Sequence, residues 1–253
     1  MILAAVLLVL PVGAKAEMYV EAYLGGSFAD DLSDRTTINW PAAGATITGR
    51  LPGVAQPAVI GGLKLGTWFV KEGFLGYNYP DWMKYLGFYL DFSYHRLDLK
   101  NQNFNTNINA GGASAFFAST DFKSEGTAAT LAFMFAARYG FLPDSEVPFG
   151  RLQPYVAVGP AILFSSQQPT ISFGPGVFKV DNGSQSSTDI ALAVDAGIRY
   201  MALKNVSIDA SFKYRWANPS YSYSGSLLGI PADYNYQPTY NLFSFQLGAA
   251  YHF

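Results

Sequence analysis

One short stretch of the sequence carries residue types that could do hydrolytic chemistry. In YLGFYLDFSYHRLD, Asp91, Ser93 and His95 stand two residues apart, so in an extended strand their side chains share one face. Aspartate, serine and histidine are the groups of a nucleophilic triad. Here the serine precedes the histidine within one strand, and the second histidine, His252, lies at the far end of the chain. We therefore favour a hydrogen-bonded or solvated His95 and expect no catalytic residue.

No pattern in the sequence indicates a cofactor. The chain has no cysteine and only two histidines, which lie in well-separated segments, so we expect no thiolate or histidine metal site. Asp30, Asp31 and Asp34 could offer carboxylates to calcium, but solvated charges are the preferred interpretation. Glycine pairs at 61–62 and 111–112 lack the strand-to-helix context of a phosphate loop, so we expect them in turns or close contacts. The prediction is no metal and no cofactor.

The composition narrows the class of protein. Charged residues make up 13% of the chain and aromatic residues 16%, a composition that fits poorly with a water-facing surface. The net charge of −2 offers no basic patch for nucleic acid. After the first ten residues, no apolar run approaches the roughly 20 residues of a spanning helix. We therefore expect no nucleic-acid partner and no helical membrane domain.

The N-terminus has the pattern of an export signal. MILAAVLLVLPVGAKA is an apolar segment that ends in Ala14-Lys15-Ala16, a small-x-small cleavage site. We predict that residues 1–16 are a cleaved signal peptide and that 17–253 form the mature protein. The alternative, a membrane anchor, would need a longer apolar segment.

The rest of the chain alternates between apolar and polar residues with period two. The closing stretch NLFSFQLGAAYHF shows it, with Phe243, Phe245 and Leu247 separated by Ser244 and Gln246. Eight segments share the pattern: 17–28, 58–70, 85–98, 126–139, 152–165, 188–200, 205–217 and 240–253. We predict that each is a β-strand.

Length and polarity decide where these strands lie. Strands of soluble proteins average about 5 to 6 residues, whereas a tilted strand that crosses a bilayer needs about 9 to 11. The eight segments meet the longer figure, and one face of each is polar while the other is apolar, as in a lipid-embedded barrel. An open sheet edge has no hydrogen-bond partners in lipid, so the first and last strands must pair. The prediction is an all-β, eight-stranded antiparallel up-and-down transmembrane barrel in the outer membrane.

The connections alternate in length. The long ones, at 29–57, 99–125, 166–187 and 218–239, are rich in Asn, Ser, Gly, Thr and Pro and are expected to be solvated outer loops. The short ones are expected to be periplasmic turns, which places both termini in the periplasm. Aromatic residues crowd the strand ends, as interfacial girdles do: Tyr79, Trp82, Tyr85, Tyr139, Tyr200 and Tyr251 at one end, and Tyr94, Phe164 and Trp216 at the other.

A family resemblance follows from these features. With eight strands, LQPYVAVGPAILF in the fifth, and Phe253 behind Tyr251 at the end, the chain resembles the small outer-membrane barrels related to the outer membrane protein A barrel and the opacity proteins. The resemblance implies that Tyr251 and Phe253 form a C-terminal signal for the barrel assembly machinery. It also implies a surface role, from structural support to adhesion, with an unidentified surface ligand. Some barrels of similar outline are lipid-modifying enzymes, which keeps a role for His95 as the remoter alternative.

The polar parity predicts a lumen filled by charged side chains. Glu21, Lys64 and Asp91 lie halfway along adjacent strands and should touch, while Asp195 and Arg199 should meet Asp209 and Lys213 in a second cluster. With Arg138 and Arg215, the inward set holds four acids and five bases. Such balance favours pairing over ion selectivity, and an eight-stranded barrel has little room beyond its own side chains. We therefore expect a structural or surface-interaction protein. The alternative is a small pore or a conduit for hydrophobic ligands.

Overall fold

A computed structural model describes residues 17–40, 44–70, 79–173, 178–181, 183–227 and 230–253 of the chain. The expected signal peptide, 1–16, lies outside the described residues. Fourteen β-strands and the 3-10 helix η3 (Asp81–Tyr85) make up the described secondary structure. No helix in these ranges is long and apolar enough to cross a membrane.

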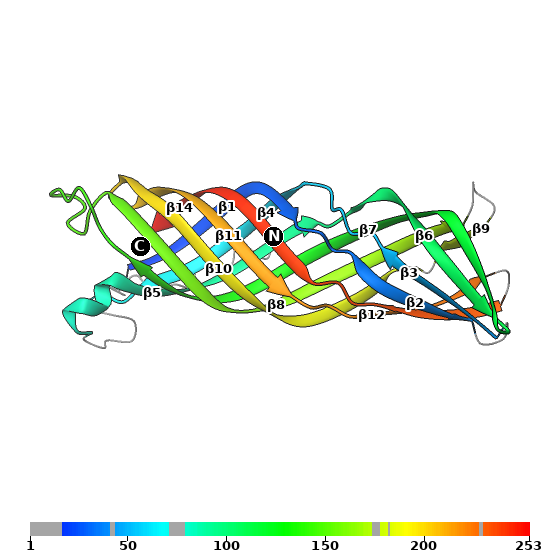
Figure 1. Ribbon diagram of the computed structural model, residues 1–253. Coiled ribbons are helices and arrows are strands. Elements are labelled where there is room, and N and C mark those ends of the chain that lie inside the picture. Colours follow the sequence, from blue (N-terminus) through cyan, green and yellow to red (C-terminus); the bar gives the residue numbers. More distant parts are fainter. Residues whose placement is uncertain (1–16, 41–43, 71–78, 174–177, 182, 228–229) are drawn as a thin grey trace, which may run out of the picture.

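Eight strands close into an antiparallel barrel, as predicted (Figure 1). The first and last strands pair directly, from Tyr19 opposite His252 to Ala29 opposite Leu242. Each barrel strand overlaps one of the eight predicted segments. In the order of their pairing, the members are β1 (Glu17–Ala29), β4 (Ala58–Trp68), β5 (Leu86–Arg96), β7 (Ala113–Arg138), β8 (Leu152–Phe173), β10 (Gln185–Leu203), β11 (Val206–Ala217) and β14 (Tyr240–His252). Three strands, β7, β8 and β10, extend well beyond the predicted segments.

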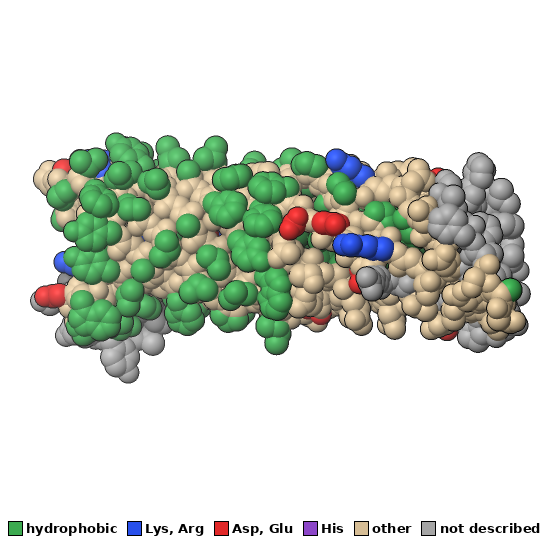
Figure 2. All heavy atoms as spheres, in the orientation of Figure 1, with side chains coloured by type: hydrophobic (Ala, Val, Ile, Leu, Met, Phe, Trp, Pro, Cys, Tyr) green, Lys and Arg blue, Asp and Glu red, His purple; other side chains and the backbone are tan. Residues whose placement is uncertain are grey.

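Alternation along each strand separates an apolar outside from a polar inside. On β14, Leu247 is 68% exposed while Gln246 beside it is 3% exposed. The same alternation occurs on other strands of the barrel: Val59 and Ile190 are exposed, whereas Lys64 and Asp195 are buried. Figure 2 shows the outward hydrophobic side chains gathered over the barrel and sparse at the other end of the molecule. This belt is the surface that lipid covers.

The long connections are not the solvated loops that the sequence indicated. They contain strands that continue the wall beyond the apolar belt, here called the β-extension, at the end of the molecule opposite the C-terminus (Figure 1). Its strands pair in the order β12, β13, β2, β3, β6, β7, β8, β9, where β7 and β8 contribute their distal parts. The added strands are β2 (Asp34–Trp40), β3 (Ala45–Leu51), β6 (Leu99–Ala110), β9 (Phe178–Asp181), β12 (Tyr221–Leu227) and β13 (Ile230–Tyr236).

These segments form strands because they bury an apolar face of their own. In NFNTNINA of β6, exposed asparagines alternate with inward residues such as the buried Thr106. In YSYS of β12, exposed serines alternate with the buried Tyr221 and Tyr223. Asparagine and serine on the solvated face gave these segments the composition of loops. The β-extension core includes Leu32, Ile47, Leu51, Phe122, Ile171, Tyr221, Tyr223 and Tyr236.

Two glycine predictions are confirmed. Gly111 and Gly112 have φ of 55° and 86° and form the two-residue turn between β6 and β7, a conformation that glycine adopts without strain. Gly62 lies inside the barrel, where an added Cβ would stand 2.3 Å from the ring of Tyr23. Close packing therefore requires glycine there.

Two of the connections at the opposite end are short or tightly hydrogen-bonded. Lys204 and Asn205 make the turn between β10 and β11. In the turn between β7 and β8, Asp144 accepts the backbone N–H groups of Val147 (2.8 Å) and Glu146 (2.9 Å) and forms an ion pair with Arg151. The Val147 N–H and the Arg151 guanidinium lower the pKa of Asp144 below its ordinary value. This turn is thereby fixed in an ionised, hydrogen-bonded form.

Candidate functional site

The inward faces of the strands bring the predicted charged residues to the middle of the barrel. Backbone register places Lys64 on β4 between Glu21 on β1 and Asp91 on β5. On the other side of the ring, Asp195 and Arg199 of β10 stand opposite Lys213 and Asp209 of β11. All seven side chains are buried, and we call them the lumen charge network: Glu21, Lys64, Asp91, Asp195, Arg199, Asp209 and Lys213.

Lys64 lies at the centre of this network. Its Nζ is 3.0 Å from a carboxylate oxygen of Glu21, 3.3 Å from Asp195 and 3.8 Å from Asp209. β4 and β10 are four places apart in the ring of eight strands, so the Lys64–Asp195 pair crosses the lumen. The side chain of Lys64 is 1% exposed. It therefore joins opposite walls where a channel would need open space.

Two other ion pairs join strands that are not neighbours in the wall. Arg199 of β10 donates to Glu21 of β1 at 2.6 Å, and it also lies 3.4 Å from Asp209 of the adjacent strand β11. Asp91 pairs with Lys213 of the facing strand β11, not with its neighbour Lys64. The two clusters that the sequence suggested are thus one network, because long side chains reach across a narrow barrel as readily as along its wall.

Tyrosines that the sequence analysis did not single out complete the network. Three phenol hydroxyls donate to the three aspartates: Tyr23 to Asp91 at 2.6 Å, Tyr89 to Asp195 at 2.9 Å, and Tyr155 to Asp209 at 2.9 Å. Burial of a charge is costly unless it is paired and hydrogen-bonded. The tyrosines share the inward parity of the charges, and that shared parity is the signal that could have identified them.

A separate ion pair closes the end of the barrel near the C-terminus. Arg138 donates to both carboxylate oxygens of Glu17 and, at 3.0 Å, to Gln153. Its guanidinium carbon lies 4.1 Å from the ring centroid of Trp68 and 4.2 Å from that of Phe149, within the range of cation–π contacts. Glu17 raises the inward carboxylates to five, which equals the five cations: Lys64, Arg138, Arg199, Lys213 and Arg215.

Asp91, Ser93 and His95 do not assemble a triad. The Nδ1 of His95 lies 2.8 Å from the backbone carbonyl of Arg96, and its side chain is buried. Ser93 accepts a hydrogen bond from Arg215 at 3.3 Å, and Asp91 is held by Tyr23 and Lys213. Each group thus has another partner, and the arrangement activates no nucleophile.

Beyond the network, the lumen continues into the apolar core of the β-extension. Here the hydroxyl of Tyr221 donates to Ser165 at 2.6 Å and lies 2.9 Å from that of Tyr240. Tyr223 and Tyr236 donate to backbone carbonyls, both at 3.0 Å. Burial raises the pKa of Tyr221 to about 12, so its hydroxyl stays neutral at physiological pH. A second layer of packed side chains therefore lies above the charged one.

The remaining predicted residues lie at the ends of the barrel. His252 is buried with its Nε2 2.9 Å from Ser207 Oγ. Tyr251 and Phe253 are about half exposed, and their rings meet edge to face with centroids 5.2 Å apart. Asp31 caps its own loop through Ser33, and Asp34 accepts the backbone N–H of Gln237 at 2.8 Å. Within the described residues, no group of three His, Asp or Glu side chains is placed to hold a metal.

The closed eight-stranded wall and its apolar belt agree with a comparison of the sequence with protein families. The model of the outer membrane protein beta-barrel domain matches residues 2–253. The chain belongs to this family. Membership places it in the outer membrane of a Gram-negative type of cell envelope, with lipid around the belt.

Solved structures of other outer-membrane proteins are similar in outline. Neisserial surface protein A is 14% identical, with 93% of this chain and 97% of that chain covered and a TM-score of 0.40. OprG from Pseudomonas aeruginosa is 16% identical, with 95% and 98% covered and a TM-score of 0.42. A major outer membrane protein from Thermus thermophilus is 13% identical, with 94% and 100% covered and a TM-score of 0.48. No curated protein matches the chain.

Proposed function

We propose that this protein is a sealed outer-membrane barrel that holds a rigid β-structured platform at the cell surface for interaction. The single observation that carries the proposal is Lys64, whose Nζ lies within 4 Å of carboxylates from three other strands at the centre of the lumen. A lumen crossed by such a network conducts no hydrated ions. The barrel is therefore better suited to hold the β-extension in place than to transport a solute.

The shape of the β-extension supports a display role. Its strands continue the barrel wall and enclose an apolar core, so its outer face is held in one arrangement. That outer face is polar, with exposed residues such as Asn103, Asn107 and Ser222. A rigid polar surface makes contacts with little loss of conformational entropy on binding.

The orientation in the membrane is part of the proposal. The β-extension faces the outside of the cell, and the end with the short turns and both mature termini faces the periplasm, after export and cleavage behind Ala16. In this class of barrel, short turns are periplasmic and long segments are external. Tyr251 and Phe253, exposed at the periplasmic end, are available to the barrel assembly machinery.

Cysteine labelling tests the orientation and display directly, because the chain has no native cysteine. Ser114→Cys lies in the β6–β7 hairpin of the β-extension, and Lys204→Cys lies in the turn between β10 and β11. A membrane-impermeant maleimide added to intact cells should label the first variant and spare the second. Both should react after the outer membrane is permeabilised. Labelling of Lys204→Cys alone in intact cells would refute the proposal.

A further inference from the structure

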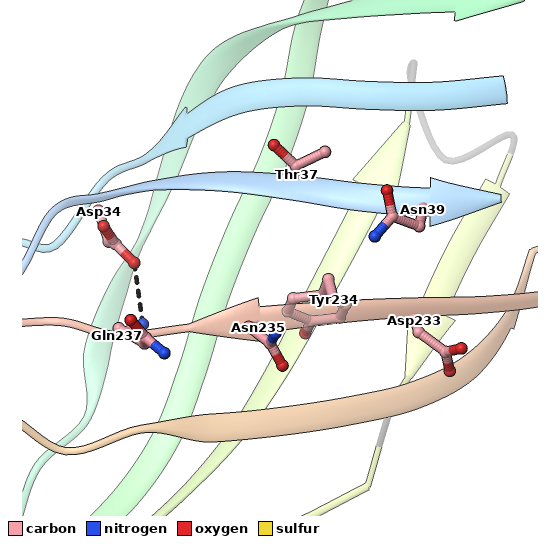
Figure 3. A pocket seen from close by; sticks show the side chains of 7 residues that line it. All are labelled: Asp34, Thr37, Asn39, Asp233, Tyr234, Asn235 and Gln237. Carbon is pink, nitrogen blue, oxygen red and sulfur yellow. Dashed lines mark hydrogen bonds between the residues drawn. The ribbon is translucent and has the colours of Figure 1, made fainter.

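The wall of the β-extension is interrupted between β2 and β13. These strands form a ladder of only two residue pairs, Asp233 with Asn39 and Tyr234 with Ile38. Further along, they are joined again where the backbone N–H of Gln237 donates to a carboxylate oxygen of Asp34 (Figure 3). Between these two ends, the wall opens into a hollow of about 400 Å³. Small-molecule sites have volumes of roughly 300–1,000 Å³.

The described lining of this hollow is polar and carries no positive charge. Two carboxylates, three carboxamides and a threonine hydroxyl surround the buried Tyr234, whose ring stacks on that of Tyr223 with centroids 4.9 Å apart. Figure 3 shows these side chains along both strands that border the hollow. The lining residues are Asp34, Thr37, Asn39, Asp233, Tyr234, Asn235 and Gln237.

Three side chains of this lining are available to a ligand. The side chains of Thr37, Asn39 and Asp233 are exposed and make no hydrogen bond to another described residue. A carboxamide both donates and accepts hydrogen bonds, a hydroxyl does the same, and a carboxylate accepts several. This set matches a ligand with many hydroxyl groups, each of which is both donor and acceptor.

Other ligand classes fit the hollow less well. Two carboxylates, with no cation among the described lining side chains, repel an anion. Asp34 and Asn39 are five residues apart on β2, or about 17 Å at 3.4 Å per residue, and Asp233 stands beside Asn39, so one metal ion cannot contact both carboxylates. An added peptide strand needs a longer free edge, and here the ladder and the Asp34–Gln237 hydrogen bond end the gap within about three residues.

We propose that the hollow between β2 and β13 binds a short neutral or amino-substituted oligosaccharide. Asn39 and Asp233 hold hydroxyl or ammonium groups of the sugar at one end, Thr37 and Asn235 line the middle, and Tyr234 forms the floor. The site deepens the proposed surface role and rests on it for access to saccharides outside the cell. The same chemistry could come from a free saccharide or from the sugars of the membrane's own glycolipid.

Binding to purified protein tests the site apart from its exposure on cells. Maltotriose, the trimer of N-acetylglucosamine, the trimer of glucosamine and trigalacturonate would be titrated by calorimetry into protein refolded in glycolipid-free micelles. The neutral and amino trimers should bind and trigalacturonate should not. Binding of trigalacturonate alone, or of none of the trimers, would overturn the proposal. Calcium that binds in the same titration while the sugars do not would also overturn it.

Two variants and one matched control locate the binding. Asn39→Leu and Asp233→Leu should each weaken saccharide binding about tenfold, since each removes one or two hydrogen bonds to the ligand. Both should fold normally, as shown by heat-dependent migration in SDS, because neither side chain has a partner in the described protein. Asn107→Leu, on the outer face of β6, should leave binding unchanged. Equal effects from all three folded variants would place the ligand elsewhere and refute the site.

Nanodiscs distinguish the two sources of the sugar. If the site takes free saccharide, the neutral trimers bind equally in discs with and without lipopolysaccharide. If it takes the membrane's own glycolipid, lipopolysaccharide in the disc competes for the hollow and reduces trimer binding to the wild-type protein. Labelling of Ser114→Cys on cells reports exposure independently, so a failure of the display role is distinguishable from a failure of the site.

Discussion

Replacing Lys64 by methionine should destabilise the barrel more than any other single change to a side chain of the lumen. The substitution keeps most of the aliphatic volume and removes one positive charge. Glu21, Asp195 and Asp209 then remain buried, with Arg199 in contact with only Glu21 and Asp209. Asp195 keeps its hydrogen bond from Tyr89 but has no cation within 4 Å among the described residues.

The size of the effect follows from this geometry. Breaking one buried ion pair costs about 3–5 kcal/mol, because the remaining charge stays out of water without compensation. Three carboxylates share Lys64, and each is no more than 2% exposed, so the loss in unfolding free energy should lie at the upper end of that range. An exposed pair would lose only about 0–1 kcal/mol.

Urea midpoints in lipid vesicles measure this difference. The matched control is Lys123→Met, because Lys123 is half exposed and 3.8 Å from the exposed Glu125, and it should shift the midpoint very little. Glu21→Gln and the double variant Lys64→Met/Glu21→Gln complete a cycle. The double variant should lose about 0.5–3 kcal/mol less unfolding free energy than the sum of the losses of the two single variants. Small, additive losses at both positions would mean that the lumen is solvated, and the reasoning would be refuted.

Other changes probe the turn, the β-extension core, the C-terminus and barrel closure. The pKa of Asp144 is lowered in the folded protein, so its carboxylate stabilises the fold above the ordinary pKa of 3.8, and this stabilisation is lost as the pH falls through the folded pKa. The difference in urea midpoint between Asp144→Asn and wild type should therefore vanish in strong acid. A difference that stays constant with pH would contradict this. Tyr221→Phe should lower the unfolding free energy by about 1–3 kcal/mol, since Ser165 loses a buried donor, whereas an unchanged urea midpoint would show that the bond is dispensable. Phe253→Ala should reduce folded protein in the outer membrane more than it reduces the stability of refolded protein; equal amounts in cells would exclude an assembly signal. Unheated protein should migrate differently in SDS from boiled protein, and equal mobility of demonstrably folded protein would exclude a closed barrel.

The membrane barrel could be predicted because lipid imposes one rule along every strand. The alternation that set Leu247 outside and Gln246 inside also fixed the inward faces of Glu21 and Lys64. Backbone closure then follows from the absence of water at a sheet edge. The pairing of Asp91 with Lys213 could not be predicted, because it depends on how far two facing strands stand apart and on the reach of the side chains.

The β-extension was missed for a different reason. Its outer face is solvated, so residues such as Asn107 and Ser222 dilute the apolar signal to that of a loop. Only the inward residues between them, among them Tyr221 and Tyr223, carry the period of two. The hollow between β2 and β13 could not be predicted from the sequence, because it forms where two strands from distant parts of the chain separate after two residue pairs.

Conductance across a planar lipid bilayer is the most direct test of the sealed lumen. Purified wild-type protein, shown to be inserted and folded, should give no stable single-channel steps, because the network around Lys64 and the tyrosine layer above it fill the path. Lys64→Met should remain closed where it folds, since Arg199, Lys213 and the tyrosines still span the lumen. Stable steps of appreciable size from the wild-type protein would contradict the account and establish a pore.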